Sequence, residues 1–169
     1  MICFLFSILR LDRETVTTNI SSTTAYYIYK CLFSNIRTAD GGAVHLRGLE
    51  RSFIYSNEFF KCSSDGDTSA MSVGFGGSAI ENRVVSCTSR RFAVITAGVQ
   101  MSCMTLHDCH VSTFCLLLSQ IHVPVDNINI TSCSSSGYVP SLYLDYVNST
   151  IKYYNCYNNT GETVILLRA

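Results

Sequence analysis

The sequence predicts an all-β fold, a parallel β-helix (solenoid) of about six coils, each about 22–26 residues long. Three observations favour this fold. An apolar-x-x-Cys stretch recurs along the chain, a second apolar stretch follows it after a polar turn, and no window of ten or more residues has apolar residues at helical spacing. Abundant Ser, Thr, Asn, Tyr, Ile and Val also favour strands and turns over helices.

The first repeated element is a pair of interior places three residues apart. The apolar place holds Phe33, Phe59, Val84, Leu106, Ile130 and Tyr153, and the cysteine place holds Ile36, Cys62, Cys87, Cys109, Cys133 and Cys156. If the coils stack in register, like residues lie above like, and each place forms an internal ladder. Small, polarizable cysteines suit the point where a strand bends inward.

The second repeated element is an apolar stretch after each polar turn. It covers residues 43–46, 70–73, 92–95, 115–118, 142–144 and 164–166. The turns before it contain much of the Gly, Asp, Ser and Asn. Short extended pieces at 52–55, 98–101 and 121–123 then lead into the next unit.

A unit of two or three short strands cannot bury its apolar face alone, but stacked units can. Each strand then pairs in parallel with its equivalent one coil away, at a spacing of about 4.8 Å. We therefore divide the chain into an N-terminal segment, 1–24, and β-helix repeats, 25–169.

The two ends of the chain raise separate expectations. The apolar stretch at 1–9 is either a signal remnant or a first strand, because no basic residue precedes it and no small-residue cleavage site follows. The last unit stops in mid-strand without a polar cap. We expect a fragment of a longer solenoid, with further β-helix coils or end-to-end self-association as partners.

Composition bears on partners and location. The net charge is zero and only 14% of residues are charged, so no nucleic-acid partner is expected. No run of about 18 apolar residues is present. Four Asn-x-Ser/Thr sequons favour an extracellular or cell-surface location. The candidate glycosylation sites are Asn19, Asn129, Asn148 and Asn158.

The nine cysteines do not have the spacing of a metal site. None forms a Cys-x-x-Cys pair, and the odd count excludes complete intramolecular pairing. The cluster His107-Asp108-Cys109-His110 would place neighbouring side chains on opposite faces of an extended strand, so its members would not converge on one ion. We expect no metal, no cofactor, and buried free thiols in the cysteine place.

Two short motifs resemble a known family. Gly41-Gly42-Ala43-Val44 is similar to the Gly-Gly-Ala-Ile repeat of the chlamydial polymorphic outer-membrane proteins, and residues 76–80 match it loosely. Phe59 to Cys62 resembles their Phe-x-x-Asn repeat, with Cys in place of Asn. Related right-handed repeats occur in protist surface proteins. The resemblance, over about residues 25–169, implies a right-handed β-helix in a surface-exposed, adhesin-like protein without catalytic residues.

Two function hypotheses remain open. The first is a non-catalytic surface or secreted module, structural or binding a glycan or another cell-surface partner through exposed tyrosines. The candidates are Tyr26, Tyr27, Tyr138, Tyr143, Tyr146, Tyr153, Tyr154 and Tyr157. The alternative is a polysaccharide lyase or glycoside hydrolase, for which Asp65 and Asp67 form the best carboxylate pair and Arg90-Arg91 the best cation clamp.

Overall fold

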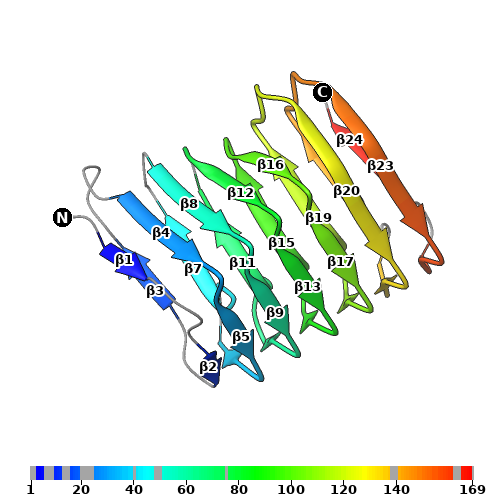
Figure 1. Ribbon diagram of the computed structural model, residues 1–169. Coiled ribbons are helices and arrows are strands. Elements are labelled where there is room, and N and C mark those ends of the chain that lie inside the picture. The colour runs from blue at the N-terminus through cyan, green and yellow to red at the C-terminus, as the bar shows by residue number, and fades with distance from the viewer. Residues whose placement is uncertain are drawn as a thin grey trace.

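The chain folds as a stack of parallel strands that forms a β-solenoid of about five turns (Figure 1). The computed structural model describes residues 3–5, 10–12, 16–19, 25–39, 41–47, 51–74, 76–137, 141–161 and 165–168. None of these residues lies in a helix, and the paired strands run parallel. The predicted all-β parallel solenoid is therefore confirmed.

Each coil contributes strands to four faces. The first face contains β1 (Cys3–Leu5), β4 (Ala25–Tyr29), β8 (Arg51–Tyr55), β12 (Ser78–Ile80) and β16 (Gln100–Ser102). The second contains β2 (Arg10–Asp12), β5 (Leu32–Ser34), β9 (Glu58–Phe60), β13 (Arg83–Val85) and β17 (Thr105–His107). The third contains β6 (Arg37–Thr38), β10 (Ser63–Ser64), β14 (Thr88–Ser89), β18 (His110–Val111) and β21 (Ser134–Ser135). The fourth contains β3 (Val16–Asn19), β7 (Val44–Arg47), β11 (Thr68–Val73), β15 (Phe92–Ala97), β19 (Phe114–Ser119), β22 (Leu142–Asp145) and β24 (Ile165–Arg168).

Two longer strands join the first and second faces. β20 (Val125–Thr131) pairs with both β16 and β17, and β23 (Ile151–Tyr157) pairs with β20. The two faces therefore form one 12-stranded sheet, beside a five-stranded and a seven-stranded sheet. The extended piece expected at 121–123 is wrong, because those residues lie outside any strand and β20 begins only at Val125.

The solenoid bends where a single non-glycine residue adopts a left-handed backbone. The first corner, between the first and second faces, has this conformation at Lys30, Ser56, Glu81, Cys103, Asn127 and Tyr153, and the second corner, between the second and third faces, has it at Asn35, Lys61, Ser86, Asp108, Ser132 and Asn158. Their φ angles lie between 51° and 58°. A left-handed backbone at a non-glycine residue costs about 1–2 kcal/mol. Contacts made by the side chain that follows must offset this cost.

The apolar place forms part of the core. Phe33, Phe59, Val84, Leu106 and Ile130 are register partners in successive coils. All five side chains are fully buried. The rings of Phe33 and Phe59 stack with their centroids 4.9 Å apart, which is close to the strand spacing.

The last coil has a different register from the one that the sequence suggested. Cys156 pairs with Ile130, and Tyr153 lies at the first corner with 78% of its surface exposed. The residue that follows Cys133 in the cysteine place is Asn159, since Thr131 pairs with Tyr157. The assignment of Tyr153 and Cys156 to the two interior places was therefore wrong by three residues. Asn159 can occupy the cysteine place because its side-chain amide hydrogen-bonds to the preceding coil.

The two Gly-Gly motifs lie at different corners. Gly41 and Gly42 precede β7 on the fourth face, with φ angles of 87° and 79°, and a Cβ on Gly42 would lie 2.9 Å from the carbonyl oxygen of Ala70. Gly77, with φ 107°, precedes β12 on the first face, and a Cβ there would clash with the backbone of Ser52. Both motifs are explained by close backbone approach, although they are not equivalent in the coil.

Parts of the N-terminal segment also form strands. Within residues 1–24, β1, β2 and β3 pair in parallel with β4, β5 and β7. The remaining residues of that segment lie outside the described residues. The division of the chain at residue 24 stays a prediction.

Candidate functional site

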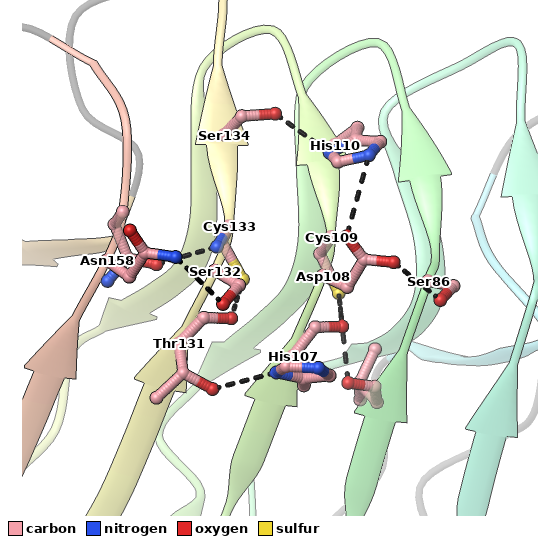
Figure 2. Close-up of polar contacts among 12 residues, drawn as sticks. Ser86, His107, Asp108, Cys109, His110, Thr131, Ser132, Cys133, Ser134 and Asn158 are labelled. Carbon is pink, nitrogen blue, oxygen red and sulfur yellow. Dashed lines mark hydrogen bonds and ion pairs between the residues drawn. The ribbon is translucent and has the colours of Figure 1, made fainter.

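Polar side chains gather on the outside of the second corner, across the coils of β13, β17, β20 and β23 (Figure 2). We call this set the polar corner. It comprises Ser86, His107, Asp108, His110, Asn129, Thr131, Ser132, Ser134, Asn155, Tyr157 and Asn158. They come from matching positions in successive coils, so the polar corner is a short array and not a single cleft.

The left-handed turn at Asp108 creates the centre of the polar corner. Its φ of 54° turns the chain so that His107, Asp108 and His110 are all on the outside, while Cys109 points inward and is buried. The expectation that these residues alternate along one extended strand was therefore wrong. A polar residue stands immediately before each of the four cysteines in the cysteine place from Cys62 to Cys133, and this pattern could have indicated the turn.

Hydrogen bonds across the polar corner join each coil to the next. Ser86 Oγ donates to Asp108 Oδ2 at 2.9 Å, and Asn158 Nδ2 donates to Ser132 Oγ at 3.4 Å. His107 Nδ1 lies 3.0 Å from Thr131 Oγ1. These bonds run parallel to the solenoid axis and orient the side chains.

The second face adds an amide pair to the polar corner. Asn155 Nδ2 donates to Asn129 Oδ1 at 3.1 Å. Each amide still has donors or acceptors beyond this one bond. Exposed amides of this kind can hydrogen-bond a polar ligand.

Three residues form a serine–histidine–aspartate series. Ser134 Oγ is 2.8 Å from His110 Nδ1, and His110 Nε2 is 3.8 Å from Asp108 Oδ1. Covalent hydrolysis would also need donors aimed at the developing oxyanion. The neighbouring backbone N–H groups are already used, because Ser134 N–H donates to Cys109 O and Ser135 N–H to Thr160 O. These two N–H groups are therefore not free to bind a developing oxyanion.

The polar corner has an exposed aromatic ring at one end. Tyr157 is 72% exposed, in the same register row as His107 and Thr131. Other proposed tyrosines are engaged elsewhere. Tyr27 stacks on Phe53, Tyr143 stacks on Phe114, and the Arg168 guanidinium lies 5.6 Å from the Tyr146 ring centroid. Tyr154 is half-buried against the core, while Tyr138 and the side chain of Tyr26 lie outside the described residues.

Free thiols line the inside of the same corner. Cys62, Cys87, Cys109 and Cys133 are buried and unbridged. Hydrogen bonding to Cys62, together with burial, raises the pKa of Cys87 well above its ordinary value, and hydrogen bonding to Cys133 with burial does the same for Cys109. A continuous cysteine ladder stays a prediction.

Cysteine and asparagine make the same contact at this corner. Cys62 Sγ lies 3.5 Å from Phe33 O, the carbonyl three residues before the equivalent place in the coil below. In the last coil Asn159 Nδ2 donates to the corresponding Ile130 O at 2.8 Å, and its Oδ1 accepts from Cys133 N–H at 2.7 Å. A cysteine thiol and an asparagine amide can therefore occupy the same position, and either side chain links its coil to the preceding one.

The carboxylates proposed for hydrolysis lie in surface ion pairs. Asp65 is 3.0 Å from Arg37, and Asp67 is 3.4 Å from Arg91. Arg90 is exposed in the turn, and its N–H donates to Gly66 O. A shallow groove beside Asp65 has a volume of about 290 Å³. It is lined by Arg37, Ser63, Ser64, Asp65, Thr88 and Ser89.

The candidate metal and glycosylation sites can also be placed. Across the described residues, no three His, Cys, Asp or Glu side chains are grouped so that they could bind a metal ion. Asn148 and Asn158 are exposed, Asn129 is half-buried, and the side chain of Asn19 lies outside the described part of the chain. In that same described part, no helix is long and apolar enough to cross a membrane.

No protein-family model, curated protein or solved structure matches the chain.

Proposed function

We propose that this chain is a non-catalytic β-solenoid module of an extracellular or cell-surface protein, and that it binds glycans through the polar corner. The observation that carries the proposal is the array itself: hydrogen-bonding side chains repeat over successive coils beside the exposed ring of Tyr157. Sugars present vicinal hydroxyls and an apolar ring face. Side chains that both donate and accept, next to an open aromatic ring, match those two features.

Two further observations support a surface role. Asn148, which lies outside the polar corner, is exposed within a sequon, as an oligosaccharyltransferase would require. The Gly41-Gly42-Ala43-Val44 motif and the stacked coils are consistent with the resemblance to polymorphic outer-membrane and protist surface proteins. Adhesion is therefore part of the proposal.

The ion pairs of Asp65 and Asp67 favour binding over hydrolysis. A catalytic carboxylate pair needs one acid and one base aimed at the same glycosidic bond. Here each carboxylate lies beside an arginine. We therefore propose a module that holds a glycan without cleaving it.

The test compares two tyrosines on the same strand, β23. A glycan array identifies a bound oligosaccharide, and calorimetry then measures its affinity for the wild type and for Tyr157→Ala and Tyr153→Ala. Loss of ring stacking should weaken binding about fivefold to tenfold in Tyr157→Ala. Tyr153 is 78% exposed but lies at the first corner, so its replacement should leave affinity unchanged. Equal losses in both variants, or no bound glycan, would refute the proposal.

A further inference from the structure

We infer that the ligand of the polar corner is a neutral glycan, extended along the solenoid axis. The inference rests on the proposed glycan-binding function and adds the class of glycan. Two observations support it: the formal charge at the polar corner and the direction in which its side chains are arrayed.

The charge at the polar corner does not favour an acidic ligand. Among its described residues Asp108 is the only side chain with a formal charge when His107 and His110 are neutral. Asp108 is about half exposed, so it faces anything that lies on the corner. A uronate or sulfate placed there would be repelled by the Asp108 carboxylate.

Cations in the same register rows lie outside the polar corner and have contacts of their own. Arg83 precedes Thr105 by one coil and is 2.9 Å from Glu58. Lys61 precedes Ser86 by one coil, and its ammonium lies 5.0 Å from the Phe60 ring centroid. Neither belongs to the set that would hold the ligand, so an acidic sugar gains no matched partner there.

The direction of the array favours an extended chain. Three rows of the polar corner run parallel to the axis: His107, Thr131 and Tyr157; Ser86, Asp108, Ser132 and Asn158; His110 and Ser134. Successive members are about 4.8 Å apart. A linear glycan along the axis would present hydroxyls to each coil in turn, and Tyr157 would contact a sugar ring at one end.

The experiment uses matched ligands that differ only in charge. Hexamers of β-1,4-glucan, mannan and chitin are titrated into the protein, followed by the C6-oxidised uronate form of whichever hexamer binds. The neutral form should bind at least fivefold more tightly than its uronate form, the factor expected for one unit-charge pair about 4 Å apart in water. Affinity for the neutral form should rise with chain length up to about four sugars, one for each of the coils of β13, β17, β20 and β23.

Two aspartate variants separate the outcomes. Asp108→Asn should reduce the preference for the neutral form about fivefold, because it removes the repelling charge. Asp65→Asn removes an exposed carboxylate from the third face and should leave the preference unchanged. Equal or tighter binding of the uronate form by the wild type would overturn this inference while the proposed function stands. If none of the hexamers binds, the proposed function fails, and this inference fails with it.

Discussion

Asn82→Met tests whether buried amide bonds hold the first corner together. Asn82 is fully buried beside Asn57, which is 1% exposed. Its Oδ1 accepts from Asn57 N–H at 3.2 Å and from Asn57 Nδ2 at 2.9 Å, and its Nδ2 donates to Ile54 O at 2.8 Å and Ile80 O at 3.1 Å. Methionine is the appropriate replacement, because Met104 occupies the equivalent position one coil on.

The expected loss follows from these four bonds. Without Asn82, Asn57 N–H loses its acceptor, at about 2 kcal/mol for a buried donor, and the other three groups lose one bond each, at about 0.5–1 kcal/mol apiece. Asn57 Nδ2 keeps its bond to Ile28 O at 3.0 Å. Burial of the methionine side chain returns about 1–2 kcal/mol. The net loss should therefore be about 1.5–4 kcal/mol, a large part of the stability of an ordinary domain.

Equilibrium unfolding in urea, followed by far-ultraviolet circular dichroism, measures this loss. Asn155→Met is the matched control, since Asn155 is an exposed residue of β23 that has no left-handed backbone and whose side chain bonds to Asn129, and it should change stability by less than about 0.5 kcal/mol. If Asn82→Met unfolds within about 1 kcal/mol of the wild type, the amide pair does not stabilise the corner and the reasoning is wrong.

The remaining predictions concern the turns and the thiols. Gly77→Ala should lower the free energy of unfolding by several kcal/mol, because the new Cβ would clash with the Ser52 backbone. Gly98→Ala should lower it by about 1–2 kcal/mol, the cost of a left-handed backbone. Similar losses in urea titrations of the two variants would contradict the clash at Gly77. In native protein a thiol reagent should label exposed Cys103 at once but should label Cys87 and Cys109 only on unfolding. Both thiols are buried, and their raised pKa disfavours the reactive thiolate. Early labelling of either residue, detected by mass spectrometry, would show that reagent reaches the inside of the second corner in the native state. Cys109→Asn should stay within about 1 kcal/mol of the wild type, because Asn159 shows how an amide fits this place, whereas Cys109→Asp should cost several kcal/mol for a buried unpaired charge; equal unfolding midpoints would refute the equivalence.

The coil period could be predicted because burial imposes the same choice in each coil. Phe33, Phe59, Val84, Leu106 and Ile130 are large apolar residues at one register position, and a cysteine follows the last four of them after a fixed interval of three residues. Such a repeat is visible without an alignment of related proteins. The parallel pairing follows from it, since equivalent strands are separated by a whole coil.

The last coil could not be predicted in the same way. Cys156 and Asn159 both lie within reach of the expected interval, and a rule based on cysteine selects the first. The pairing of Thr131 with Tyr157 and the hydrogen bonds of Asn159 to Cys133 N–H and Ile130 O identify the residue that occupies the corner. Sequence spacing contains no information on which of the two side chains finds those partners.

The polar corner was missed because the cluster at residues 107–110 was interpreted as one strand. One left-handed residue, Asp108, brings side chains from two strands to the same outer edge. Left-handed backbone at a non-glycine residue has only a weak local signal, although Asp, Asn and Ser are among the residues that accept it. The contacts of His107 and His110 with Thr131 and Ser134 also depend on the coil above, about 24 residues away.

The direction of the bonds between coils determines how the solenoid should respond to force. Backbone hydrogen bonds that lie along the axis join each coil to the next. A pulling force along that axis therefore loads the hydrogen bonds of one coil at a time, and the coils should unfold one after another. Every opened coil would release about 22–26 residues, or roughly 80 Å of extended chain. The coil joined through Asn57 and Asn82 has additional amide bonds and should open last among its neighbours. A module of this construction on a cell surface would lengthen in steps under shear while the rest of the stack stayed folded.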